Sequence, residues 1–225
     1  MSAAPLRVEG LGFRRPGAES FVMRLEHLEV GAGEVVAMVG PSGSGKSTLL
    51  QLISGELVPQ TGSVHVGGVR MDTLPDAERR AVRRRRIGVV AQTLSLIEYL
   101  SGIENVLLVS IMEGGARASR DRARELARSL DVEHVLSRRP HRMSQGERQR
   151  IAICRALLLR PPVLLCDEPT GNLDADRGER AVRLMLDAAR SDQAAVLIAT
   201  HDERLIPLVD RVVSLEAELA DGAPS

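Results

Sequence analysis

One short run of the sequence, Gly40 to Thr48, constrains the fold more strongly than any other. Its letters, GPSGSGKST, match the pattern G-x-x-x-x-G-K-[ST]. The valine-rich stretch Glu34–Val39 before it is typical of a buried strand, and Ser47–Leu57 after it is typical of a helix. A strand, a glycine-rich turn and a helix N-terminus present a row of backbone N–H groups to an anion. The run therefore predicts an α/β fold with a phosphate site at the end of a strand.

The residue types in this run indicate a nucleotide as the ligand. Glycines would let the backbone wrap the phosphates, Lys46 would reach the β- and γ-phosphates, and Ser47 would ligate Mg²⁺. Lys46 is the one lysine among the 30 basic residues, which fits a position where the guanidinium of arginine cannot replace a compact ammonium. The predicted nucleotide-binding residues of this run are Gly40, Pro41, Ser42, Gly43, Ser44, Gly45, Lys46, Ser47 and Thr48.

Two adjacent carboxylates, Asp167 and Glu168, end a second apolar run that begins at Val163. Successive side chains at a strand end point in different directions, so the two acids can serve different roles. Asp167 would hold Mg²⁺ through water, and Glu168 would polarise an attacking water. In isolation the pair could be two solvated acids at a strand end. Together with the glycine-rich run, it predicts hydrolysis of a nucleoside triphosphate by positioning and charge stabilisation.

A third motif lies at Arg142–Arg150, directly before an apolar pattern with helical spacing. Ser144 and Glu147 have the S-x-x-E spacing of a capping box, so we expect a helix to start at Ser144. A helix N-terminus that carries a serine and a glycine is a second anion site. Alone, this pattern would indicate only the start of a helix.

Taken in order, these motifs resemble those of the ATP-binding cassette (ABC) ATPases. The run Met143–Gly146 resembles the signature motif of that family, commonly LSGGQ or LSGGE. Gln92, after the apolar stretch Ile87–Ala91, resembles the Q-loop glutamine, and residues 171–174 resemble the D-loop. His201 follows the predicted strand 195–200 and resembles the switch histidine. The resemblance is greatest to the branch that powers lipoprotein release and macrolide-type export.

The resemblance implies an α/β P-loop NTPase fold with a RecA-like core. An antiparallel β-subdomain would occupy about residues 6–35 and 62–69, and a helical subdomain would be inserted at about 93–159. The whole chain, 1–225, would be a single nucleotide-binding domain, with a frayed tail at about 217–225. Cassettes of this family dimerise head to tail around two ATP molecules, so each chain would complete the site of the other.

The resemblance also implies roles for individual residues. The catalytic residues would be Glu168, His201 and Lys46, and the Mg²⁺ ligands Ser47, Gln92 and Asp167. Gln92 would also contact ATP, and Ser144, Gln145, Gly146 and Asp174 would contact the ATP held by the partner. Two departures stand out: Gln145 replaces the usual signature glycine, and Arg15 stands where the family has an aromatic residue that stacks on adenine. A guanidinium plane can also stack on a base, so Arg15 is a candidate adenine contact.

The family implies an ATPase subunit, working as a homodimer or paired cassette, that drives an integral membrane permease on a separate chain. The chain would then be cytoplasmic and held at the membrane face by that permease. Two alternatives stay open: a mechanical ATPase that signals to envelope enzymes, and a soluble cassette that acts on nucleic acid or ribosomes. The resemblance implies that the permease would dock near residues 94–102, whose apolar side chains could equally be core. The arginines 83–86 could be a solvated helix end or a contact with lipid or permease.

Composition argues against several other classes. Basic and acidic residues both number 30, which gives net charge +0, so a sequence-independent grip on nucleic acid is not favoured and no nucleic-acid partner is expected. No apolar run approaches the roughly 20 residues that span a bilayer. Residues 1–9 lack the pattern of a secretion signal, and we expect an intracellular chain. Cys154 and Cys166 lie in apolar stretches and are expected in the core, not in a disulfide.

Overall fold

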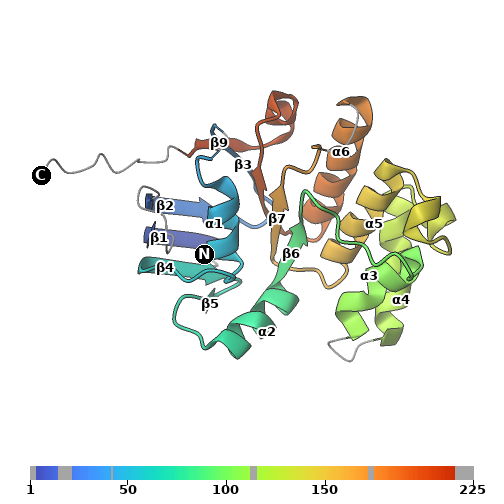
Figure 1. Cartoon of the computed structure of the whole chain (residues 1–225), viewed down its shortest axis with the longest axis horizontal. Helices are drawn as coiled ribbons and strands as arrows, with labels where there is room; N and C mark the ends of the chain where they lie inside the picture. Colours follow the sequence, from blue (N-terminus) through green and yellow to red (C-terminus); the bar gives the residue numbers. More distant parts are fainter. Residues whose placement is uncertain (1–3, 15–21, 42, 112–115, 172–174, 216–225) are drawn as a thin grey trace, which may run out of the picture.

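A five-stranded parallel sheet forms the centre of the molecule (Figure 1). The computed structural model describes residues 4–14, 22–41, 43–111, 116–171 and 175–215. The strand order is β6-β7-β8-β3-β9, and every pairing in this sheet is parallel. Its strands are β3 (Val35–Val39), β6 (Ile87–Val90), β7 (Val163–Asp167), β8 (Ala195–Ala199) and β9 (Arg211–Ser214). Strands β3, β7 and β8 are almost wholly apolar because other elements cover both faces of the sheet.

A second, antiparallel sheet packs beside the first and is formed mainly by the N-terminal part of the chain. Its order is β2-β1-β4-β5, with β1 at Leu6–Arg14, β2 at Val22–Val30, β4 at Thr61–Val66 and β5 at Val69–Arg70. The buried residues of β1 shift by one position at Gly10, which has φ +55°, because the pairing with β4 is irregular there. The shift keeps one face of the strand in the core along its whole length.

Three helices lie together on the side of the molecule away from the antiparallel sheet (Figure 1). They are α3 (Gly102–Ile111), α4 (Ala116–Ser129) and α5 (Gln145–Leu157). The remaining helices are α1 (Lys46–Ile53), α2 (Asp76–Arg86) and α6 (Ala175–Ser191), with short 3₁₀ turns η1 (Glu133–Val135), η2 (Pro140–Arg142) and η3 (Glu203–Leu208). This arrangement confirms the predicted fold class.

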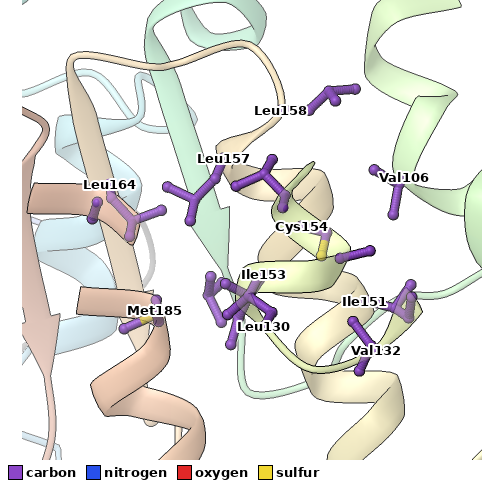
Figure 2. Packing of buried hydrophobic residues seen from close by; sticks show 14 of the residues in the cluster. Val106, Leu130, Val132, Ile151, Ile153, Cys154, Leu157, Leu158, Leu164 and Met185 are labelled. Atoms are coloured by element: carbon purple, nitrogen blue, oxygen red, sulfur yellow. The ribbon is translucent and has the colours of Figure 1, made fainter. Parts of the chain in front are cut away.

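Two hydrophobic clusters hold these layers together, one on each face of the parallel sheet. The first joins the antiparallel sheet and α1 to β3 and β8. The second joins the other face of the sheet to α6 and to the three helices. Figure 2 shows α5 inside this second cluster, between Leu164 of β7 and Met185 of α6 on one side and Val106 of α3 on the other. Helix α5 therefore links the helical layer to the sheet.

The helix after the glycine-rich run is shorter than predicted. It begins at Lys46 and ends at Ile53, whereas the sequence pattern predicted a helix to Leu57. Gly55 follows with φ +70°, and its carbonyl oxygen accepts a hydrogen bond from Arg79 Nε at 2.8 Å. A Cβ at Gly55 would lie 2.5 Å from Arg79 Cγ, so only glycine fits this close approach. The chain therefore turns away four residues early.

The described part of the chain contains no helix that is both long enough and apolar enough to cross a membrane. Both cysteines are buried and free, as predicted. Cys154 lies in the second hydrophobic cluster, and the sulfur of Cys166 is 3.6 Å from that of Met185. Burial raises the pKa of both thiols, because a thiolate would lose its hydration.

The folded protein should therefore resist thiol reagents. With an aromatic disulfide reagent at pH 8, we expect no labelling on a timescale of minutes and two thiols per chain after unfolding in urea. Absorbance of the released thiol measures both. Rapid labelling of one cysteine in the native protein would contradict the placement of these side chains in the core.

Candidate active site

Three loops that begin at neighbouring strand ends meet at one edge of the parallel sheet. Strands β7, β8 and β3 are adjacent, and parallel pairing places their carboxyl ends at the same edge. The glycine-rich loop 40–45 follows β3, Glu168 follows β7, and Thr200 and His201 follow β8. Residues that the sequence separates by more than a hundred positions are thereby brought together.

The loop after β3 has the backbone conformation of an anion cradle. Gly43 and Gly45 have φ values of +82° and +95°, in the region that favours glycine. A Cβ at Gly40 would lie 2.7 Å from both Leu215 O and Ser44 Oγ, so the chain also needs glycine there. Gly45 is the N-cap of α1, so the N-cap residue has no side chain with which to cap the helix. The N–H groups in the first turn of a helix favour an anion.

The polar side chains of the loop fit a bound phosphate group. Lys46 is nearly buried, and its ammonium contacts the carbonyl oxygens of Gly40 at 2.7 Å and Pro41 at 3.0 Å. Ser44 Oγ is buried and has no hydrogen-bond partner among the described residues. Neutral carbonyl groups hold this buried cation, and the hydroxyl near it is unsatisfied. A bound anion would pair with the cation and accept a hydrogen bond from the hydroxyl.

The hydroxyl of Ser47 donates a hydrogen bond to Asp167 Oδ1 at 3.3 Å. Burial raises the pKa of Asp167, and the nearby Glu168 carboxylate raises it further, while Ser47 and Lys46 act in the opposite direction. A divalent cation bound beside these two adjacent carboxylates would stabilise the ionised form of Asp167. A hydroxyl and a carboxylate are ligands that suit Mg²⁺, which keeps several waters and usually takes few protein ligands. The described residues contain no cluster of three or more His, Cys, Asp or Glu of the kind that forms an all-protein metal cage.

Glu168 is held in an unusual backbone conformation, with φ +45°. An L-residue pays about 1–2 kcal/mol for such a conformation. Two backbone hydrogen bonds fix the turn, from Glu168 N to Ala199 O at 2.9 Å and from Gly171 N to Glu168 O at 3.0 Å. As a result the carboxylate does not continue the alternation of β7 but turns toward the loop that follows β8.

The carboxylate of Glu168 is bound from two sides. Thr200 Oγ1 donates to Oε2 at 3.2 Å, and the backbone N of His201 lies 3.4 Å from the same oxygen. His201 Nδ1 is 2.7 Å from Oε1. Glu168 is 14% exposed at its side chain and His201 is 76% exposed, so the pair faces solvent through the imidazole. The structure thus brings together Lys46, Ser47, Asp167, Glu168 and His201.

Gln92 is exposed and lies beside the turn that follows Glu168, since a Cβ at Gly171 would be 3.6 Å from its Nε2. The segment after Gln92 is held by residues that sequence reasoning did not identify. Arg155, in the last turn of α5, donates to Leu94 O at 2.7 Å and to Ser95 O at 2.9 Å. The fully buried Asn105 binds the backbone of residues 97–101 through its side-chain amide.

The start of α5 is the capping box that the sequence predicted. Ser144 is the N-cap, its Oγ accepts from Glu147 N at 3.4 Å, and Glu147 Oε2 accepts from Ser144 N at 2.7 Å. Ser144 and Gln145 are exposed, whereas Gly146 is buried. Among the described residues, no hydrogen bond joins Ser144 to the glycine-rich loop of the same chain. The predicted contacts of Arg15, Ser42 and Asp174 lie outside the described residues.

Comparison with known sequences agrees with this geometry. The sequence model of a family described as "ABC transporter" matches residues 25–171. The chain belongs to the ABC transporter family.

Two relatives show how far this likeness extends along the cassette. An uncharacterized ABC transporter ATP-binding protein of Mycobacterium tuberculosis (strain CDC 1551 / Oshkosh) is 40% identical over 196 residues. The match covers 87% of this chain but only 59% of that protein, so the chain spans less than two thirds of its length. The lipoprotein-releasing system ATP-binding protein LolD of Gluconobacter oxydans is 43% identical over 216 residues, which are 95% of this chain and 94% of that protein.

A solved ABC cassette has the same fold. The dimeric structure of the cassette MJ0796 in a post-hydrolysis state, bound to ADP and Pi, has a TM-score of 0.80 and 32% identity. The superposition covers 95% of this chain and 96% of that one.

Asp202 follows His201 directly, and its carboxylate holds the turn between β8 and η3. It accepts from Thr170 Oγ1 at 2.9 Å, caps η3 at Arg204 N, and pairs with the guanidinium of Arg204 at 2.7 Å. Hydrogen bonds from Arg204, followed by those from Thr170 and the backbone, lower the pKa of Asp202 to about 2 against the opposing effect of burial. Sequence reasoning missed this residue, although an aspartate that follows a strand is a frequent helix cap.

The lowered pKa predicts how this loop responds to acid. A depressed pKa stabilises the folded state above the ordinary value of 3.8, and the stabilisation is lost as the pH falls toward 2. We expect Asp202→Asn to lower the unfolding free energy at pH 7 by roughly 0.5–1 kcal/mol, with the difference shrinking between pH 4 and pH 2. Urea denaturation at each pH measures it. Asp187→Asn, at an exposed position of α6, is the matched control, and an equal change in both variants would contradict the assignment.

Proposed function

We propose that this cassette binds Mg-ATP, hydrolyses it as one of a pair, and powers a membrane permease carried on a separate chain. The observation that supports this most directly is the meeting of Lys46, Ser47 and Asp167 with the Glu168–His201 pair at one sheet edge. The proposed role in transport is supported by the family, whose named relatives include the ATP-binding protein LolD of a lipoprotein-releasing system.

In the proposed reaction the glycine-rich loop and Lys46 would hold the β- and γ-phosphates, exchanging carbonyl contacts for phosphate oxygens. Ser47, Asp167 and Gln92 would hold Mg²⁺, which supplies positive charge against the phosphates. Glu168 would orient the attacking water and accept its proton. His201 would keep that carboxylate directed at the water through the 2.7 Å contact. Catalysis would then rest on positioning and charge stabilisation.

We further propose that two copies pair head to tail around two ATP molecules. Ser144, Gln145 and Gly146 would meet the γ-phosphate held by the partner, and Asp174 would lie near the same seam. The exposed start of α5, not bonded to its own glycine-rich loop, supports this arrangement. The similar cassette MJ0796 is dimeric with ADP and Pi bound. Gln145 would place a longer side chain than glycine at the seam.

The permease would bind where the segment after Gln92 meets α5 and β6. A cleft of about 320 Å³ lies there. Its lining includes Val89, Leu94, Val109, Ala152, Arg155 and Leu159. Tyr99 is 74% exposed in the same segment, while its neighbours Leu96, Ile97 and Leu100 are half-buried. Through this contact the chain would reside on the cytoplasmic face of the membrane.

The pairing and the role of Glu168 can be tested together. Glu168→Gln should bind Mg-ATP, hydrolyse it at least ~100-fold more slowly, and accumulate as a dimer. Light scattering should then show twice the chain mass of 24.3 kDa with Mg-ATP and the single-chain mass without it. Adding Lys46→Ala to this variant should abolish the shift. Turnover near that of the wild type would remove Glu168 from the proposed role, and a monomer with ATP bound would contradict self-pairing.

The proposed stacking of Arg15 on adenine has its own test. A stacked guanidinium is worth roughly 0.5–1 kcal/mol, so Arg15→Ala should raise the KM for ATP about 2- to 5-fold with little change in kcat. Arg14→Ala is the control, since Arg14 is the neighbouring arginine and ends β1. Steady-state hydrolysis measures both variants, and kinetic constants equal to those of the wild type would refute the stacking.

A further inference from the structure

A histidine outside all of the motifs touches the start of α5. His134 lies in η1, and its Nε2 is 3.0 Å from Glu147 Oε1. The other oxygen of this carboxylate, Oε2, accepts from both the backbone N and the Oγ of Ser144, at 2.7 and 2.8 Å. The three side chains therefore form a line from imidazole to carboxylate to hydroxyl. His134 is 55% exposed and Glu147 is 16% exposed, so protons reach the line from the imidazole end.

This line fixes the hydroxyl of Ser144. Its proton points at Glu147, so the hydroxyl must turn away from that carboxylate before it can donate to a phosphate oxygen. The strength of the hold depends on the charge that Glu147 presents. An ionised carboxylate only accepts hydrogen bonds, so Nε2 of His134 is the donor in the 3.0 Å contact.

Glu147 itself stays ionised near neutral pH. Burial works to raise its pKa, but hydrogen bonds from the Ser144 backbone, the Ser144 hydroxyl and His134 outweigh it, and the net shift is downward. Histidine is the side chain that ordinarily gains a proton between pH 8 and pH 5. A protonated imidazole at His134 would neutralise part of the charge on Glu147 and weaken its hold on Ser144. It would also add a positive charge beside the helix start.

We propose that His134 is a positioning residue that makes the grip of Ser144 on the partner's nucleotide tighter when the imidazole is protonated. This inference rests on the proposed function, because it assumes that Ser144 contacts ATP held by a second copy. The inference adds that pH controls the contact between Ser144 and ATP. His134 exerts this control through Glu147 and does not itself touch the nucleotide.

Other charged side chains lie on the elements around η1. Arg128 of α4 faces Glu133 at 3.8 Å, and Arg180 of α6 faces Asp131 at 3.2 Å. On α5, Arg148 donates to Met143 O at 3.2 Å. Carboxylates and guanidinium groups do not titrate between pH 6 and 8. Two other imidazoles need controls in this test: His141 in η2, next to the helix start, and His201 in the active site.

The test measures, by sedimentation, the pairing of the Glu168→Gln variant in the presence of Mg-ATP from pH 6 to pH 8. We expect the pairing constant to be about 3- to 10-fold larger at pH 6 than at pH 8. Adding His134→Gln, a neutral donor, should remove this part of the pH dependence and hold pairing near the pH 8 level. Adding His134→Arg, a permanent cation, should hold it near the pH 6 level. Glu147→Gln, which preserves the capping box, should also flatten the profile.

Two matched controls isolate the effect. His27 pairs with Glu29 at 3.9 Å on β2, far from α5 in the chain, and is about as exposed as His134, so His27→Gln should keep the parent profile. His141→Gln reports any contribution from the neighbouring histidine. A parent-like profile in His134→Gln would overturn the inference while leaving the pairing intact. A failure of every form to pair at any pH, with Mg-ATP bound, would overturn the proposed pairing and this inference with it.

Discussion

The parallel pairing of β7 with β8 and of β8 with β3 is the constraint on which the rest of the site depends. It brings three chain segments to one sheet edge and leaves their backbones to be shaped by short loops. Glycine provides the shape after β3, and a left-handed turn at Glu168 provides it after β7. That turn persists because its amide and carbonyl groups are both bonded and because its side chain is held by Thr200 and His201. Local strain is thus maintained by contacts from the neighbouring strand.

Helix α5 connects the capping box at Ser144 to the segment that follows Gln92. Ile151, Ile153 and Leu157 are fully buried and fix the helix against the sheet and α6. Its first residues carry the exposed capping box, and Arg155 in its last turn grips the backbone at Leu94 and Ser95. A rigid helix packed on several sides moves as one body. Any displacement at its N-terminus would therefore be transmitted to the segment that follows Gln92.

The sequence alone was sufficient to predict those elements that depend on residues close together in the chain. The glycine-rich run, the apolar strands and the capping box at Ser144 each depend on neighbouring residues, and the corresponding elements formed close to their predicted bounds. What it missed depends on contacts between distant segments. The hold of Arg155 on Leu94, 61 positions away, leaves no local pattern, and the early end of α1 depends on Arg79 packing against Gly55. The roles of Arg15 and Asp174 stay predictions, because both lie outside the described residues.

The fold gives the one lysine of this chain a chemical distinction. The other 29 of the 30 lysine and arginine residues are arginines, so Lys46 has the only side-chain amine in the sequence, and it begins α1 directly after the glycine-rich loop. Its nitrogen is engaged by two carbonyl oxygens and is nearly closed off from solvent. A reagent selective for primary amines would therefore find at this loop its single internal target. The rate at which that amine reacts would serve as a direct footprint of what occupies the loop.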